Sequence, residues 1–241
     1  MPLSHAITLA IDRTYTAPYI NKILATSPIA YWPLNETSGT TINCLIDSNQ
    51  DGEYTGVTLN SSTGPDGQPV GLWDGSNDEA DVFTATLAGN FNGAVGTIAI
   101  WAKVSGSGVW TDAAIRAIGP RLLANSTNYV HIYKNSTDNQ LVWIYDAAGT
   151  IESITKNPIS PTDWFHLALT WNKGADEVKA YYNGSQQGST QTGLNIFAGS
   201  LTEANVGSNN APAVIWDGYL AHAAVWDSAL TPAKIAALAT V

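Results

Sequence analysis

Glu79 and Asp81 stand two residues apart, a spacing that could support catalysis. Alternate residues of a strand point to the same side, so both carboxylates would project into one cleft. Glycoside hydrolysis needs such a pair, with one group as acid and the other as nucleophile or base. No further carboxylate follows nearby, and neither Thr84 nor Ala85 can serve as acid or base. We therefore expect Glu79 and Asp81 to be solvent-facing strand residues, and we predict no catalytic residue and no enzyme.

The same segment has four side chains with oxygen atoms that could bind calcium: Asp74, Asn77, Asp78 and Asp81. Ca²⁺ prefers carboxylate and amide oxygens as ligands. The spacing is not that of an EF-hand loop, and turns are often rich in Asp and Asn because these side chains hydrogen-bond to nearby backbone. The sequence leaves both interpretations open, a calcium site and a plain turn. No cofactor is required, and calcium is the one that the sequence suggests.

Aromatic residues are numerous, with nine Trp and ten Tyr in the chain. An exposed aromatic ring presents an apolar face on which a sugar can stack. The candidates for this role are Trp110, Tyr129, Trp143 and Trp216. Trp110 is the best of them because it lies in a polar loop rich in Gly and Ser. The alternative for each is a ring that folds back onto the core.

Charge and composition exclude several other functions. The formal net charge is −10, and no run of Lys or Arg occurs. Nucleic acids and anionic membranes both need cationic side chains, so we expect neither as a partner. The first residues lack the features of a signal peptide, and no stretch reaches the ~18 apolar residues of a membrane span. The four His residues form no zinc pair, and the single cysteine, Cys44, is expected to be a small buried residue.

The elements that must position these residues are strands. Apolar residues alternate along 165–171 and again along 178–182, and a short polar turn with a Gly separates the two segments, which predicts a β-hairpin. Further strands are expected at 29–34, 52–59, 70–73, 79–83, 96–104, 129–133, 141–145, 151–155 and 217–227. Thr231 is a good helix N-cap before Pro232, and Ile235 and Leu238 would form the packing face of a closing helix. The pattern predicts an all-β fold, a two-sheet antiparallel sandwich with a short C-terminal helix and an N-terminal arm.

Residues 1–28 differ from the strands that follow and are expected to form this arm. Thr16-Ala-Pro18 can start a short helix, and Ser27-Pro28 ends it, because a residue before proline avoids the helical region. The residues expected to contact other molecules are Tyr15, Tyr19, Ile20, Ile23 and Leu24. We predict an assembly arm at 1–28 and a single domain at 29–241.

Five segments together resemble a known family. They are the opening strand 29–39 with its aromatic pair and Ser-Gly, the Asp-Gly turn within 72–78, the central strand 97–103 with a Trp, the Trp-x-His hairpin 163–184, and the last strand with its helix, 218–238. This order resembles laminin G-like (concanavalin A-like) jelly-roll domains over about 29–240. The family's last strand usually has an acidic pair and an Arg, where this chain has Ala221, His222 and Ala223. The arm before such an opening also resembles phage virion structural proteins that have these domains.

The resemblance implies binding rather than catalysis. We expect a non-enzymatic structural or interaction protein, a capsid decoration or tail subunit at the virion surface, made in the host cytoplasm. Its jelly roll would face outward and bind cell-surface glycans, and its partners would be further copies of the chain or capsid and tail proteins. The alternative is a free-standing, extracellular carbohydrate-binding module. A glycoside hydrolase is the third possibility, because the resemblance extends to glucanases; the third carboxylate of their pattern would fall near Thr84 or Ala85 in this chain.

Overall fold

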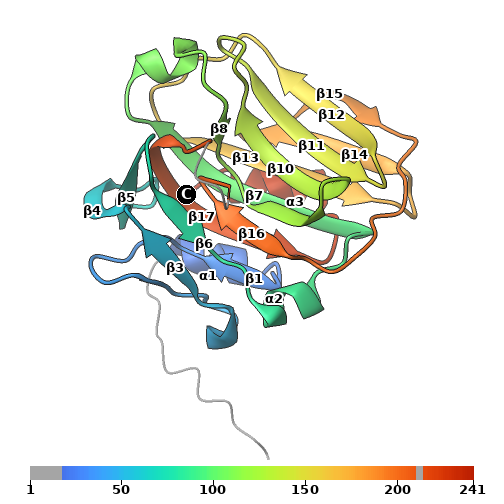
Figure 1. The fold of residues 1–241 in the computed structure, drawn as a ribbon, viewed down its shortest axis with the longest axis horizontal. Helices are drawn as coiled ribbons and strands as arrows, with labels where there is room; N and C mark the ends of the chain where they lie inside the picture. The colour runs from blue at the N-terminus through green and yellow to red at the C-terminus, as the bar shows by residue number, and fades with distance from the viewer. Residues whose placement is uncertain (1–17, 210–213) are drawn as a thin grey trace, which may run out of the picture.

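The computed structural model describes residues 18–209 and 214–241. Two antiparallel sheets pack face to face, with short helices around them (Figure 1). The all-β prediction, with two antiparallel sheets and a short C-terminal helix, is confirmed. We call the nine-stranded sheet the front sheet, because it lies toward the viewer in Figure 1, and the eight-stranded sheet the back sheet.

The strands of each sheet are far from sequence order, as expected for a jelly roll. The front sheet runs β12 (Thr150–Lys156), β11 (Leu141–Ala147), β10 (Asn128–Lys134), β9 (Arg121–Asn125), β16 (Glu203–Val206), β6 (Glu79–Asp81), β3 (Gly52–Thr55), β2 (Thr41–Ile42), with β8 (Arg116–Ala117) paired to β10. The back sheet runs β15 (Ser185–Gln191), β14 (Glu177–Tyr182), β13 (Phe165–Asn172), β7 (Val95–Val104), β17 (Asp217–Trp226), β5 (Pro69–Asp74), β4 (Thr58–Thr63), with β1 (Ala30–Trp32) paired to β17. The helices are α1 (Pro18–Leu24), α2 (Ala85–Asn90) and α3 (Pro232–Leu238), and the 3-10 turns are η1 (Ser48–Gln50) and η2 (Ser107–Thr111).

The predicted hairpin is present as β13 and β14. Leu169 lies opposite Ala180, and Trp171 lies opposite Val178, so the predicted apolar residues of the two strands lie on the same side of the sheet. All four side chains are buried in the core between the two sheets. The alternation in the sequence therefore fixed both the strand pairing and the face that turns inward.

The central strands of the back sheet are buried on both faces. Along β7, Ile98 and Ile100 point into the core between the sheets, while Ala99 and Trp101 belong to a second cluster on the outer face. Helices α1 and α3 contribute to that second cluster, so they cover the outer face of the back sheet. β7 consequently reads as a nearly continuous apolar run.

Helix α1 packs against its own domain. Ile20 and Ile23 are buried beneath it, with Leu24 partly buried beside them. The Tyr19 hydroxyl accepts a hydrogen bond from Trp101 Nε1 at 2.7 Å and donates one to the carbonyl of Leu238 at the end of α3. The apolar face that was predicted to bind other molecules is thus buried within the chain.

This packing also bears on the predicted arm as a whole. The sequence predicts a domain that begins at residue 29, but α1 lies on that domain instead of standing apart from it. Tyr15, the remaining predicted arm residue, lies outside the described residues. The closing helix follows its prediction more closely, since the Thr231 side chain caps α3 and Ile235 and Leu238 are buried.

Because α1 packs against the domain, we expect shortening of the Ile20 side chain to destabilise the fold. The side chain is 1% exposed, so Ile20→Ala should lower the free energy of unfolding by about 2–5 kcal/mol, through lost burial and the cavity left behind. Urea denaturation would measure it. Ala25→Ser, on an exposed position just after α1, is the control and should change the value by less than ~0.5 kcal/mol. Equal effects for both variants would mean that α1 is undocked in solution.

Candidate functional site

The outward side of the front sheet brings together the chain's most suggestive surface residues. Strand β10 alternates, so Val130 and Ile132 point into the core, whereas Tyr129, His131 and Tyr133 point outward. Both tyrosines are partly exposed. We call the outward side of β11, β10, β9, β16 and β6 the tyrosine face. Its polar and aromatic members are Tyr129, His131, Tyr133, Asp146, Arg121, Glu203, Asn205, Glu79 and Asp81.

Asp146 stands directly opposite Tyr129 across the β10–β11 pair. Its side chain is buried, and Oδ1 has no hydrogen-bond partner among the described residues. Burial raises the pKa of Asp146 above its ordinary value. Burial, with the nearby charge of Asp146, also raises the pKa of Tyr129, so that hydroxyl stays protonated and able to donate.

His131 lies between the two tyrosines along the strand. Its ring stacks on Tyr133 with centroids 5.3 Å apart, and its Nε2 is buried without a partner in the described structure. Burial, together with the positive charge of Arg121, lowers the pKa of His131 to about 3. The imidazole is therefore neutral near pH 7, so it offers hydrogen bonding but no charge.

The strands next to β10 add charged and amide groups in register. Arg121 lies opposite Asn205, and Asn205 lies opposite Asp81, so the three side chains form one row across β9, β16 and β6. Arg121 Nη1 pairs with Glu203 Oε2 at 2.7 Å. Asn205 Nδ2 donates to Glu79 Oε1 at 3.1 Å, which leaves Asn205 Oδ1 buried and unpartnered. Burial, followed by the charge of Asp81, raises the pKa of Glu79.

This arrangement suits a ligand with many hydroxyl groups. Two partly exposed aromatic rings supply apolar contact area with polar edges. From β11 to β6 the face spans four strand spacings of ~4.8 Å, about 19 Å in all. An elongated ligand can therefore lie across the strands and meet the tyrosines and the amide and carboxylate groups together.

Three of the four predicted stacking residues are not on this face. The expectation that Trp110, Trp143 and Trp216 are exposed is wrong, because all three are fully buried in the core between the sheets. The Trp110 side chain points from η2 into the core, and its Nε1 donates a hydrogen bond to the carbonyl of Pro161 at 2.8 Å. Trp216 Nε1 donates to the carbonyl of Lys103 at 3.2 Å. Tyr129 alone keeps the predicted surface position.

Sequence reasoning missed most of the tyrosine face. The segment Tyr129-Val-His-Ile-Tyr133 alternates between polar and apolar residues, and this signal could have placed Tyr129, His131 and Tyr133 on one side. No local signal relates β10 to Arg121 or Asn205, because the contacts come from pairing between distant segments.

The predicted calcium ligands serve their own turns. Asp78 is buried, and its Oδ2 accepts a hydrogen bond from the backbone N–H of Asp74 at 2.6 Å. Asp74 and Asp81 each accept a hydrogen bond at 2.9 Å from a backbone N–H two residues on, and Asn77 is exposed. Within residues 18–209 and 214–241, no group of three or more His, Cys, Asp or Glu is placed to hold a metal ion. This geometry favours the plain turn.

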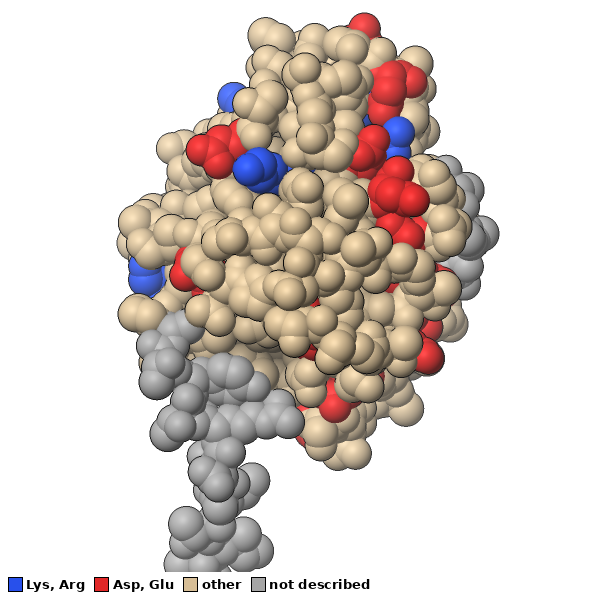
Figure 2. All heavy atoms as spheres, turned by 90° about the vertical axis from the view of Figure 1, so that its left-hand side faces the viewer, with Lys and Arg blue, Asp and Glu red and all other residues tan. Residues whose placement is uncertain are grey.

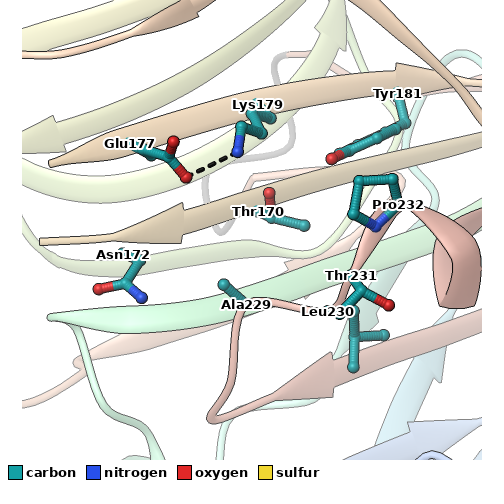
Figure 3. A pocket seen from close by; sticks show the side chains of 9 residues that line it. All are labelled: Thr170, Asn172, Glu177, Lys179, Tyr181, Ala229, Leu230, Thr231 and Pro232. Carbon is teal, nitrogen blue, oxygen red and sulfur yellow. Dashed lines mark hydrogen bonds and ion pairs between the residues drawn. The ribbon is translucent and has the colours of Figure 1, made fainter. Parts of the chain in front are cut away.

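A groove on the opposite side of the molecule is a weaker candidate. It lies on the back sheet beside the start of α3 and has a volume of about 220 Å³, below the ~300–1,000 Å³ of usual ligand pockets (Figure 3). Its cation, Lys179, is held by Glu177 at 2.6 Å. The lining residues are Thr170, Asn172, Glu177, Lys179, Tyr181, Ala229, Leu230, Thr231 and Pro232. The groove offers no exposed aromatic ring, so the tyrosine face is the better candidate.

The fold and the sequence together define the family. Residues 74–236 match the model of the concanavalin A-like lectin/glucanases superfamily, and the chain belongs to that family. The resemblance to laminin G-like and concanavalin A-like domains is therefore confirmed. No curated protein matches the sequence. No helix in the described part of the chain is long and apolar enough to cross a membrane.

Three solved structures with this fold share little sequence with the chain. Domain 4 of AbnA, a GH43 extracellular arabinanase from Geobacillus stearothermophilus in complex with arabinotriose, is 15% identical with a TM-score of 0.66, over 88% of this chain and 98% of that one. The CBM40 of Ruminococcus gnavus IT-sialidase, bound to α2,3-sialyllactose, is 12% identical with a TM-score of 0.56, over 70% and 95%. Trypanosoma rangeli sialidase with the inhibitor DANA is 9% identical with a TM-score of 0.62, over 87% of this chain and 32% of that one. The chain thus spans about a third of the sialidase.

The lowered pKa of His131 predicts a specific pH dependence of stability. An unfolded histidine gains its proton near pH 6.5, whereas the folded His131 resists protonation until about pH 3. The unfolded state therefore binds more protons in this window, and the free energy of unfolding falls as the pH drops from about 6.5 to about 3. His131→Gln should remove this loss, by up to about 1.4 kcal/mol per pH unit.

Urea denaturation of both proteins at pH 7, 6, 5 and 4 would measure the difference. Thr155→Gln, on an exposed outward position of β12, is the control and should give a curve parallel to the wild type. A His131→Gln curve that is also parallel would show that His131 titrates like a solvated imidazole.

Proposed function

We propose that this chain is a non-enzymatic glycan-binding domain whose tyrosine face holds an oligosaccharide. The observation that carries the proposal is the pair of partly exposed rings, Tyr129 and Tyr133, on either side of the neutral His131. Aromatic faces with a few fixed polar groups are the usual means of holding a ligand that has both apolar and hydroxyl surfaces. Membership of a family named for lectins and glucanases agrees with this proposal. The arabinotriose and sialyllactose bound to two structural neighbours agree with it too.

The proposal favours the free-standing binding module over the virion subunit. The assembly hypothesis relied on an arm with a free apolar face, and the described part of that face is buried on the chain's own domain. Capsid or tail partners, further copies of the chain, and a virion-surface location stay predictions from the sequence. Either that location or an extracellular one would place the tyrosine face where glycans occur.

Substitution of the two tyrosines tests the glycan proposal. The probes are arabinotriose and an array of neutral and acidic oligosaccharides, and titration calorimetry gives the affinity for each glycan bound. Tyr129→Ala and Tyr133→Ala should each weaken binding at least about tenfold, about 1.4 kcal/mol, because each removes an aromatic contact. Tyr219→Ala is the control, since Tyr219 pairs with Lys103 on the back sheet. Unchanged affinity in both front-sheet variants, or no glycan bound by the wild type, would contradict the proposal.

The absence of hydrolase activity is a separate expectation. Glu79 and Asp81 do share the outward side of β6, but the third carboxylate would fall near Thr84 or Ala85, and Thr84 caps α2. We expect the full chain to release no reducing sugar from laminarin, mixed-linkage β-glucan or arabinan in a long incubation. Release that disappears in Glu79→Gln but persists in Glu177→Gln, a substitution on the back sheet, would show that the chain is an enzyme.

A further inference from the structure

Charge on the tyrosine face is strongly one-sided. The outward positions of β11, β10, β9, β16 and β6 include four carboxylates, of Asp146, Glu203, Asp81 and Glu79, and Glu53 of β3 lies opposite Asp81. Arg121 is the one Lys or Arg among these described positions. The formal net charge of the whole chain is −10, and in Figure 2 acidic groups gather toward the right-hand edge, the side that faces the viewer in Figure 1.

The single cation on the face is already neutralised. Arg121 Nη1 and Glu203 Oε2 are 2.7 Å apart, and both side chains are largely buried, so the pair is only weakly screened by solvent. His131 cannot replace the charge, because burial and Arg121 hold its pKa far below neutral pH. Among the described residues of this face, an acidic ligand would find no free positive partner, unlike at a site that recognises a carboxylate through a bidentate Arg.

The polar atoms left without partners on this face are mainly acceptors. Asn205 Oδ1 can only accept hydrogen bonds, and Asp146 Oδ1 does the same when the carboxyl group is ionised; both side chains are more than nine-tenths buried. His131 Nε2, also buried and unpartnered, can take either role according to its tautomer. Acceptors need donors, which sugar hydroxyls supply. A ligand carboxylate would add acceptors and negative charge where both are already present.

We propose that the tyrosine face selects neutral, hydroxyl-rich glycans and rejects anionic ones such as sialylated or uronic acid-containing chains. This selectivity rests on the proposed glycan-binding function, and it restricts the expected ligands to neutral glycans. It also separates this chain from its structural neighbours that are sialidases or bind sialyllactose, with which it shares the fold alone.

The test compares matched neutral and anionic probes on the full chain. The probes are arabinotriose, lactose and cellotetraose against α2,3-sialyllactose and tetragalacturonic acid, measured by titration calorimetry at 20 mM and 500 mM NaCl. We expect every neutral probe that binds to have at least tenfold higher affinity than either acidic probe at 20 mM NaCl. This affinity ratio should fall at 500 mM NaCl, because salt screens the repulsion between the face and an anionic ligand.

Two charge variants locate the effect. Glu203→Gln removes one carboxylate and leaves the charge of Arg121 unpaired. It should therefore lower the ratio of neutral-probe to acidic-probe affinity at least threefold at 20 mM NaCl. Glu177→Gln is the matched control, since it makes the same change in net charge and breaks a comparable ion pair with Lys179 on the back sheet (Figure 3). Glu177→Gln should leave the ratio of neutral-probe to acidic-probe affinity unchanged.

The outcomes separate the two proposals. Acidic probes that bind as tightly as the neutral ones, or more tightly, would overturn the selectivity and leave glycan binding standing. An equal effect of Glu203→Gln and Glu177→Gln would also overturn it, because the discrimination would then come from net charge and not from this face. Binding of no probe at all would overturn the glycan-binding function and the selectivity with it.

Discussion

Burial of the central strands of the back sheet on both faces is the constraint on which the rest of the structure depends. Core side chains of the front sheet cover its inner face, and α1 and α3 cover its outer face. Trp101 shows the consequence, because its ring lies under α1 and its Nε1 must find the Tyr19 hydroxyl as a partner. With the central strands of the back sheet covered, the outward side of the front sheet is a broad sheet surface left for a ligand. The way the back sheet is covered therefore leaves the tyrosine face as the surface for the proposed binding function.

His222 shows how the covering elements are joined. It sits in a β-bulge of β17 with φ of 57°, and its Nδ1 lies 2.7 Å from the Tyr31 hydroxyl. Its Nε2 lies 3.3 Å from Asp66 Oδ2, and its ring meets the edge of Tyr19 with centroids 4.6 Å apart. One side chain thus links β1, the loop before β5 and α1. The resemblance described in the sequence analysis implies an acidic pair and an Arg at this place, but in this chain the position is interior, where unpaired charges would be costly.

The sequence predicted local features well, but it predicted poorly which distant residues come together in the folded chain. The β13–β14 hairpin and the cap of α3 came out as expected, because alternation, turn residues and capping act over a few positions. Trp143 did not, since Leu141-Val-Trp-Ile-Tyr145 is apolar throughout and alternation cannot say which residues point outward. The Arg121–Glu203 pair joins residues 82 apart in the chain, and only the strand order brings them together. The candidate site was therefore mostly beyond local pattern analysis, with the alternating segment 129–133 as the exception.

Unpartnered polar atoms help to distinguish a functional surface from ordinary packing. Leaving a buried donor or acceptor unpaired costs about 1–3 kcal/mol, so a face that has several is locally poor in stability. Trp73 and Trp143 also have indole N–H groups without partners in the described structure, but both lie in the core between the sheets, where no glycan can reach. His131, Asp146 and Asn205 are also buried, but they lie on outward positions of three strands, directly beneath one surface of the molecule. Natural sequences break local rules most often at functional sites, and a ligand whose hydroxyls complete these hydrogen bonds would recover the lost stability on binding.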